Sequence, residues 1–260
     1  MSEVSSKVHI VTSETTGVGR PGGGSVALVS GANSGIGKEI ARQLLAAGLT
    51  VYVGARDAER GTVAVDELGG SAQLLTLDVT DSDSVTAAAA HIGGLDVLVN
   101  NAGVNFGSEA APEAAVDTFR RTFETNVFGV IALTNALLPA LRRSAHPRIV
   151  NISSGTGSLA WSTGPNPQFD YRTGGGGAAY RSSKTALNAL TVYYAQALST
   201  NGFKVNALAP GLRATNLNSR AAASGGDPAE AAAAAVQLAL LPDDGPTAGF
   251  FSFDGTPAPW

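Results

Sequence analysis

The sequence has no cysteine, few charged residues and no hydrophobic run long enough to cross a membrane. Without cysteine, the 260-residue chain can form neither a disulfide framework nor a thiolate metal site. Charged residues make up only 15% of it, the net charge is −4 and no basic stripe is present, which argues against a nucleic-acid or anionic-membrane partner. No apolar run approaches about 20 residues, and the first residues do not resemble a signal peptide. A cytoplasmic location is therefore expected.

Histidine is scarce as well. His9, His91 and His146 are expected in the N-terminal stretch, at a helix end and in a turn, where we interpret them as surface residues. No metal site is predicted. A hydrolase built on Ser153 or Ser154 was the competing interpretation of the serine pair, but no Gly-x-Ser-x-Gly elbow surrounds either residue.

The length of the chain and the absence of repeats are compatible with one α/β domain or two small ones. We predict a single domain over residues 25–260, preceded by a flexible leader at 1–24. Short apolar segments alternate with helical patterns, which is typical of a doubly wound parallel sheet with helices on both faces. About seven strands are predicted, at 25–30, 50–54, 74–77, 95–99, 148–152, 204–209 and 249–253. Helices are predicted at 38–47, 57–68, 81–91, 112–143 and 178–200, with another inside the alanine-rich stretch 216–240.

A glycine-rich turn follows the first predicted strand and precedes a helix. In this context Gly31 permits a tight turn, Gly35 lets the backbone approach a pyrophosphate at the helix N-terminus, and Gly37 allows helix and strand to pack closely. The glycine spacing differs from the usual GxGxxG, so a chance glycine-rich loop is the alternative. We interpret the turn as part of a dinucleotide-binding domain.

The end of the second strand bears on the choice of dinucleotide. An NAD site is expected to place an acid there, but the strand ends in Gly54-Ala55-Arg56 and Asp57 comes only afterwards. An arginine suits the 2′-phosphate of NADPH. The alternative is that Arg56 is an ordinary surface charge.

Tyr180 and Lys184 lie four residues apart, on one face of a predicted helix. An ammonium beside a phenol favours the phenolate and lowers a tyrosine pKa that is ordinarily about 10. Such a tyrosine can exchange a proton with a substrate oxygen. By spacing alone, a solvated helix face is the more common explanation of such a pair. Asn126 lies inside an apolar helical stripe, and it could serve only to make a structural hydrogen bond there.

Two further segments are expected near the substrate. The long connection 155–179 contains Trp161, Phe169 and Tyr171, which could line a pocket or fasten the loop. The segment 212–240 is expected on the substrate side.

Together, separate stretches of residues 25–255 resemble the short-chain dehydrogenase/reductase family, and its carbonyl reductases in particular. The matching stretches are Ser30 to Gly37, Asp78-Val79, Asn100 to Gly103, Asn126, Ser154, Tyr180-x-x-x-Lys184, and Pro210-Gly211 with Thr215. Three features depart from the commonest pattern: Ser30 stands where the first motif usually has a threonine, Ser34 stands where NADP-dependent members often have a basic residue, and Ser154 lies unusually far from Tyr180.

The resemblance implies a catalytic set of four residues. Tyr180 would be the general acid in reduction and the base in oxidation, and Ser154 would polarise the carbonyl. Lys184 would tune the tyrosine and hold the nicotinamide ribose, and Asn126 would anchor a water of a proton relay. The implied cofactor-binding residues are Gly31, Asn33, Ser34, Gly35, Ile36, Gly37, Arg56, Asp78, Val79, Asn101, Ala102, Gly103, Tyr180, Lys184, Pro210, Gly211, Leu212 and Thr215.

These features predict a reductase that converts a ketone or aldehyde to an alcohol, with NADPH preferred and NADH as the alternative cofactor. An NAD-dependent alcohol dehydrogenase working in oxidation and a catalytically silent nucleotide sensor are the rival interpretations. The expected partner is a small carbonyl or alcohol. Family members often pair through the helix that carries the tyrosine and lysine, whereas the enlarged 155–179 connection could obstruct that face, so both a homo-oligomer and a monomer are considered.

Overall fold

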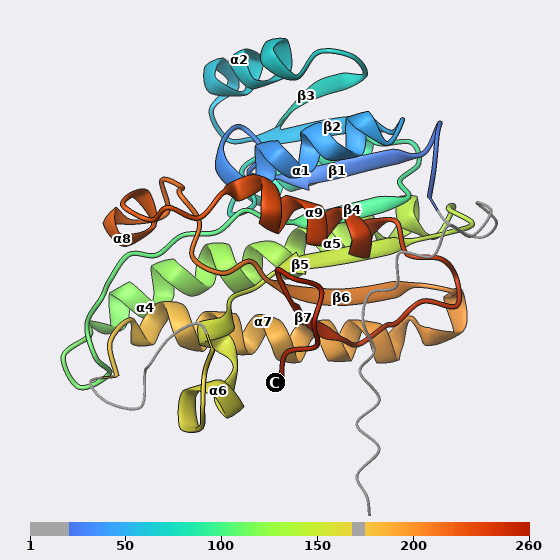
Figure 1. Cartoon of the computed structure of the whole chain (residues 1–260). Coiled ribbons are helices and arrows are strands. Elements are labelled where there is room, and N and C mark those ends of the chain that lie inside the picture. Colours follow the sequence, from blue (N-terminus) through green and yellow to red (C-terminus); the bar gives the residue numbers. More distant parts are fainter. Residues whose placement is uncertain (1–20, 168–174) are drawn as a thin grey trace, which may run out of the picture.

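The computed structural model describes residues 21–167 and 175–260, which form one parallel sheet covered by helices (Figure 1). Its strands are β1 (Val26–Ser30), β2 (Thr50–Ala55), β3 (Ala72–Thr76), β4 (Val97–Asn100), β5 (Arg148–Ile152), β6 (Lys204–Ala209) and β7 (Phe250–Ser252). They are arranged in the order β3-β2-β1-β4-β5-β6-β7, and every neighbouring pair is parallel. The chain therefore winds outward from β1 in two directions, which confirms the predicted single-domain, doubly wound fold.

The strand register brings the predicted motifs to one edge of the sheet. Ser30 at the end of β1 lies opposite Gly54 near the end of β2, and Asn100 of β4 lies opposite Asn151 of β5. The segments that follow these strands therefore leave the sheet at its carboxyl edge. The crossover between β1 and β4 is the topological switch point, where ligands of such sheets bind.

Helices cover both faces of the sheet. On one face α1 (Gly35–Ala46), α2 (Ala58–Leu68) and α9 (Pro228–Ala239) share a hydrophobic core with the strands, and on the other α3 (Ser82–His91), α5 (Gly129–Leu141) and α7 (Ala178–Ala197) do so. Alanine makes the close approach of α9 feasible: Ala231, Ala232, Ala235 and Ala239 are completely buried. Only small side chains fit where a helix packs this closely on its neighbours.

Aspartates start three of these helices. The side chain of Asp57 accepts a hydrogen bond from Arg60 N at the start of α2, and Asp81 and Asp227 cap α3 and α9 in the same way. Each cap satisfies a backbone N–H that has no partner within its helix. The predicted start of the 57–68 helix at Asp57 is confirmed.

The predicted helix 112–143 is shorter and less regular than expected. It consists of α4 (Val116–Phe123), a π-helical turn η1 (Glu124–Phe128) and α5, in direct succession. By length and composition, Val116–Leu141 could cross a membrane, contrary to the expectation that no segment is apolar enough; half of its most apolar window is buried within the protein. The core helix of a soluble protein has the same character.

The connection at 155–179 is more ordered than expected in its first part. It contains a 3₁₀ turn η2 (Gly155–Gly157) and a short helix α6 (Leu159–Thr163). Trp161 packs against Phe250 and Ala258 and lines neither cavity described below, so it fastens the loop to the edge strand β7. Phe169, Tyr171 and most of the 1–24 leader lie outside the described residues.

The 212–240 segment also divides in two. Its first part, which includes the short helix α8 (Ser219–Ala222), lies beside a cavity at the carboxyl edge, whereas α9 belongs to the core. The segment therefore contributes both to the wall of this cavity and to the core.

Candidate active site

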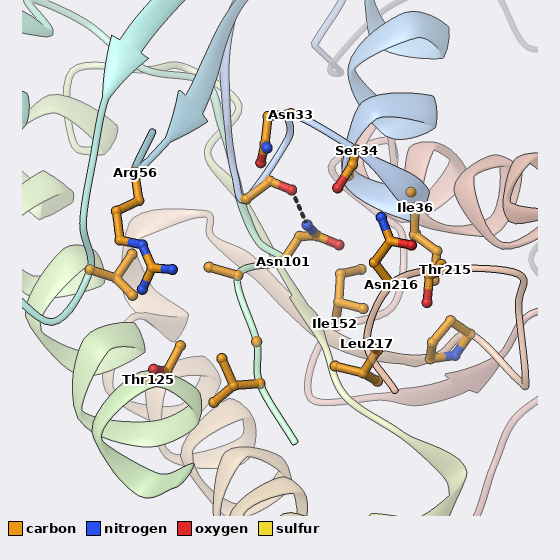
Figure 2. A pocket seen from close by; sticks show the side chains of 18 of the residues that line it. Asn33, Ser34, Ile36, Arg56, Asn101, Thr125, Ile152, Thr215, Asn216 and Leu217 are labelled. Carbon is orange, nitrogen blue, oxygen red and sulfur yellow. Dashed lines mark hydrogen bonds between the residues drawn. The ribbon is translucent and has the colours of Figure 1, made fainter. Parts of the chain in front are cut away.

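Two cavities lie at the carboxyl edge of the sheet. The larger cavity, of about 410 Å³, is bounded by the segments after β1 to β4 (Figure 2). The smaller cavity, of about 130 Å³, lies between the segment after β5, the start of α7 and the segment after β6. Five residues line both: Ile36, Tyr180, Pro210, Thr215 and Leu217. The cavities therefore adjoin, and Tyr180 lies at their junction.

The glycine turn forms one wall of the larger cavity. Gly31 and Gly35 have φ angles of +64° and +56°, which L-residues with side chains rarely adopt. Ser34 is the N-cap of α1, yet its side chain makes no capping hydrogen bond, and the first turn carries no acidic residue. The first N–H groups of α1 therefore lack a side-chain cap, and this helix terminus favours an anion such as a pyrophosphate.

A partly buried polar clamp holds this turn in shape. Asn101 Nδ2 donates to Ser30 O at 2.9 Å and to Gly31 O at 3.0 Å, and Ser30 Oγ accepts from the backbone N–H groups of Asn101 and Ala102. A Cβ atom on Gly37 would lie only 2.3 Å from Asn101 Nδ2. The third glycine thus leaves room for the clamp as well as for close helix–strand packing.

Two arginines stand on the β2 side of the larger cavity. Arg56 follows β2 as predicted, and Arg60, in the first turn of α2, lines the same cavity. We did not identify Arg60 from the sequence, although its position four residues after Arg56 beside a helix start was a usable signal. The carboxylate of Asp57 caps α2, and Asp57 does not line this cavity.

Lys184 is a buried cation next to Tyr180. Its side chain is 3% exposed, and its Nζ lies 5.7 Å from the centroid of the Tyr180 ring. The Nζ donates a hydrogen bond of 2.8 Å to Ile152 O, and no ion pair with an acidic side chain is formed within the described part of the chain. Burial lowers the pKa of Lys184 from 10.5 to about 8. The ammonium is thus an unneutralised charge beside the tyrosine.

The structure separates the two serines after β5. Ser153 is buried, and its Oγ donates to Asn188 Oδ1 at 2.5 Å, away from the smaller cavity. Ser154 lines the smaller cavity together with Tyr180, and its hydroxyl lies 2.9 Å from Thr156 Oγ1. The placement supports the choice of Ser154 over Ser153 as the serine facing a substrate.

Asn126 lies behind the cavities, in the π-helical turn. Its Nδ2 donates to Val104 O and Ser183 Oγ, at 2.9 and 3.0 Å, and its Oδ1 accepts from Val104 N at 2.9 Å. The side-chain amide therefore joins the loop after β4 to α7. This is the structural role that the sequence left open, and it uses both N–H donors of the amide and one lone pair of its oxygen.

Most of the residues predicted to bind a cofactor line one cavity. Besides Tyr180, Lys184 and Arg56, the larger cavity is lined by Gly31, Asn33, Ser34, Gly35, Ile36, Gly37, Asp78, Val79, Asn101, Ala102, Gly103, Pro210 and Thr215. Gly211 and Leu212 instead line only the smaller cavity. Thr125, Asn216 and Leu217 also line the larger cavity and were not predicted (Figure 2).

The protein combines a parallel sheet, a glycine turn at a helix N-terminus and an adjacent Tyr–Lys pair. This combination defines the class of dinucleotide-dependent enzymes. Comparison with known proteins agrees: residues 25–224 match the short chain dehydrogenase family model. The (−)-isopiperitenone reductase of Mentha piperita is 35% identical over an alignment of 305 positions, gaps included, which covers 88% of this chain and 96% of that protein. The salutaridine reductase of Papaver bracteatum is 33% identical over 300, covering 86% and 93%.

The structure of an NADPH-bound carbonyl reductase from chicken fatty liver is similar as well, with a TM-score of 0.79 and 26% identity, covering 92% of this chain and 100% of that one. The chain therefore belongs to the short-chain dehydrogenase/reductase family and resembles its carbonyl reductases. It is an oxidoreductase of this family.

Proposed function

We propose that the protein is an NADPH-preferring reductase that converts a ketone or an aldehyde to an alcohol, with Tyr180 as the general acid. The observation that carries this proposal is the position of Tyr180 at the junction of the two cavities, beside the buried Lys184. A substrate carbonyl in the smaller cavity would meet the tyrosine there.

The larger cavity suits a dinucleotide. The uncapped N-terminus of α1 and the positive φ angles of Gly31 and Gly35 suit a pyrophosphate, and Asp78 and Val79 would flank the adenine. Lys184 would hold the nicotinamide ribose, and Thr215, which lines both cavities, would lie near the carboxamide. When bound, the reduced nicotinamide supplies the hydride.

The remaining chemistry belongs to four side chains. Tyr180 Oη donates its proton to the carbonyl oxygen, and the Ser154 hydroxyl donates a hydrogen bond to the same oxygen. The Lys184 ammonium stabilises the phenolate left behind. Asn126 is the proposed anchor of a relay water; because both of its amide N–H donors are already engaged, that water would have to donate to a free lone pair of one of its oxygens.

The decisive experiment is Tyr180→Phe, which removes only the phenolic hydroxyl. We expect turnover of a panel of ketones and aldehydes, followed by NADPH absorbance, to fall at least about a thousandfold, while NADPH fluorescence still reports binding. Unchanged turnover would exclude Tyr180 as the acid. Cofactor binding by the wild-type protein with no turnover of any carbonyl would favour the nucleotide sensor instead.

The NADPH preference is supported by two arginines, Arg56 and Arg60, on the β2 side of the larger cavity. The chicken carbonyl reductase, which is similar in fold, carries NADPH. Replacing both arginines by alanine is expected to raise the KM for NADPH by about tenfold or more and to leave that for NADH within about threefold, because NADH has no 2′-phosphate. Equal effects on both cofactors would instead favour the NAD-dependent dehydrogenase. A cytoplasmic location, where NADPH is available, is part of the proposal.

A further inference from the structure

We propose that Thr156 is a positioning residue, which makes the Ser154 hydroxyl a hydrogen-bond donor to the substrate carbonyl. This inference rests on the proposed reductase function and deepens the description of the same site. Thr156 lies in the 3₁₀ turn η2 and lines the smaller cavity together with Ser154 and Tyr180. It belongs neither to the four catalytic side chains nor to the residues that would bind the cofactor.

Two contacts join Thr156 to the Ser154 hydroxyl. Thr156 N donates to Ser154 Oγ at 3.2 Å, and the two hydroxyl oxygens lie 2.9 Å apart. A hydroxyl oxygen has two lone pairs and carries one proton. The backbone N–H of Thr156 therefore occupies one lone pair of Ser154 Oγ. The direction of the bond between the two hydroxyls then decides whether the Ser154 proton is available to a substrate.

Burial favours Thr156 as the donor in the bond between the two hydroxyls. Thr156 is 8% exposed, and in the described chain Ser154 Oγ is the one hydrogen-bond partner of its hydroxyl. Ser154 is more exposed, so its proton can reach an acceptor in the cavity. If Ser154 donated instead, the Thr156 proton would lack an acceptor in a mostly buried position, which is costly. Donation from Thr156 to Ser154 gives both protons a partner once a substrate is bound.

With Thr156 as the donor, Ser154 Oγ has one hydrogen-bonding capacity left. Both of its lone pairs are occupied by groups of Thr156, the backbone N–H and the hydroxyl, so only its own proton remains. A carbonyl oxygen can only accept, and it therefore matches this remaining capacity. A hydroxyl that receives a hydrogen bond is also polarised by it and becomes a stronger donor. Thr156 thus orients the Ser154 proton toward the carbonyl and strengthens its hydrogen bond.

The turn that carries Thr156 packs directly on the helix that carries Tyr180. Gly157 O accepts from Thr185 Oγ1 of α7 at 2.9 Å. A Cβ atom on Gly157 would lie only 2.8 Å from the carbonyl carbon of Lys184, so no side chain separates the turn from the helix. This close packing fixes the position of Thr156 relative to Tyr180, which lies one turn before Lys184 on α7.

The first test compares replacements that remove or keep the Thr156 hydroxyl. Thr156→Val removes it with little change in shape, whereas Thr156→Ser keeps it. With NADPH and the panel carbonyl that the wild type reduces fastest, we expect Thr156→Val to lower kcat about tenfold and to change KM less than about threefold, because the hydrogen bond strengthens as charge develops on the oxygen. Thr156→Ser should stay within about threefold of wild type in kcat. Thr163→Val is the matched control, since its exposed hydroxyl donates to Leu159 O in α6, and it should change kcat less than about twofold.

A double variant shows whether Thr156 acts through Ser154. Ser154→Ala alone should lower kcat at least about a hundredfold, and adding Thr156→Val to it should lower kcat less than about twofold further. A tenfold further loss in the double variant would mean that Thr156 acts on the substrate by itself, and the inference would be overturned. Equal losses in Thr156→Val and Thr156→Ser would overturn it as well, because the hydroxyl would not be responsible.

Neutron diffraction locates the two protons without any turnover. In crystals of the deuterium-exchanged protein with NADP+, the deuteron of Thr156 Oγ1 should point at Ser154 Oγ, and the deuteron of Ser154 should point into the smaller cavity. The opposite arrangement overturns the inference whatever the kinetics show. If the deuterons lie as expected but no carbonyl of the panel is reduced, the inference holds and the proposed reductase function fails.

Discussion

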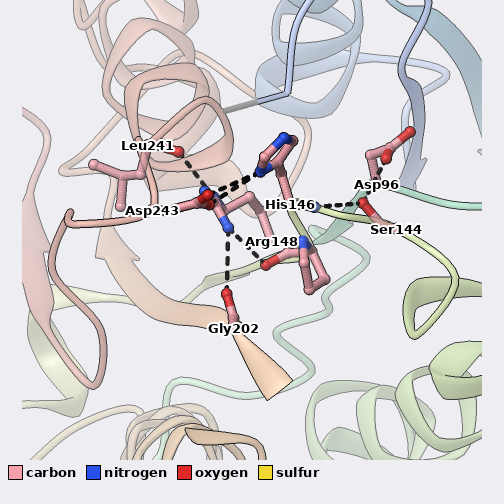
Figure 3. A network of polar contacts seen from close by, with 8 residues as sticks. Asp96, Ser144, His146, Arg148, Gly202, Leu241 and Asp243 are labelled. Atoms are coloured by element: carbon pink, nitrogen blue, oxygen red, sulfur yellow. Dashed lines mark hydrogen bonds and ion pairs between the residues drawn. The ribbon is translucent and has the colours of Figure 1, made fainter. Parts of the chain in front are cut away.

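The two ends of β5 hold buried cations in opposite electrostatic settings. At its first residue, Arg148 is completely buried and donates to Leu241 O at 2.8 Å, Pro147 O at 3.1 Å and Asp243 Oδ1 at 2.7 Å (Figure 3). At its last residue, Ile152, the carbonyl accepts from Lys184 Nζ, a cation with no acidic partner in the described chain. One cation is paired and the other is left available.

The pKa shifts of these groups follow from whether each buried cation has an acidic partner. Burial lowers the pKa of Arg148, and the hydrogen bond to Asp243 opposes that shift. Burial alone would raise the pKa of Asp243, but hydrogen bonds from Arg148 and His146 hold it below its ordinary value. Lys184 has no such compensation, and burial brings its pKa to about 8. The Arg148 network therefore fastens the segment after α9 to the sheet, whereas Lys184 keeps a charge that chemistry can use.

The largest effect on stability should come from replacing Arg148, the paired cation at the start of β5. Arg148→Met leaves the Leu241 carbonyl and the Asp243 carboxylate without their donor, and we expect it to lower the free energy of unfolding by about 3–5 kcal/mol. Urea denaturation measures this loss. Arg142→Met, at an exposed arginine just past α5, is the matched control and should stay within about 0.5 kcal/mol of wild type. A loss from Arg148→Met as small as that of the control would show that the network is not a structural clamp.

At the other end of β5, removing the buried cation should stabilise the protein instead of destabilising it. Lys184→Met removes a buried charge that has no acidic partner, so the free energy of unfolding at pH 7 should rise by about 1–3 kcal/mol. Turnover should fall at least about a hundredfold, because the phenolate of Tyr180 loses its neighbouring cation. Denaturation and kinetics on the same preparation test both statements. If the variant is both active and less stable, Lys184 is a structural residue.

The pH dependence sharpens the comparison further. The pKa of Lys184 is lower in the folded chain, about 8, than its ordinary value of 10.5, so between these values the unfolded chain binds more protons. The contribution of Lys184 to stability is therefore unfavourable below pH 8 and is relieved as the pH rises toward 10.5. The stability gain of Lys184→Met over wild type should shrink across this window, and carbonyl reduction should decline above about pH 8. A gain that is constant with pH would contradict the depressed pKa.

The smallest effect on stability is expected from replacing His146, the partly exposed neighbour of Asp243. His146 Nδ1 lies 3.0 Å from an Asp243 oxygen, but both side chains are partly exposed (Figure 3). His146→Gln should change the free energy of unfolding by less than about 1 kcal/mol, since exposed ion pairs contribute little. A larger loss, measured by the same denaturation, would make His146 an essential member of the network and would revise its interpretation as an ordinary surface residue.

The sequence by itself determined the elements and the outline of the site. Alternating apolar segments specify strands and helices, Asp57 specifies where α2 begins, and the glycine turn needs residues without a Cβ at Gly31 and Gly35. Tyr180 and Lys184 share a helix face because of their spacing alone. These are local properties, since neighbouring residues and backbone geometry decide them.

Only the tertiary structure decided which polar groups are buried and which of them meet. Arg148 begins a strand, where a charge is usually solvated, yet segments distant in sequence enclose it and supply its acceptors. In the same way, packing turns Ser153 away from the smaller cavity and leaves Ser154 in it. Burial and pairing depend on contacts between residues far apart in the chain, and no local pattern encodes them.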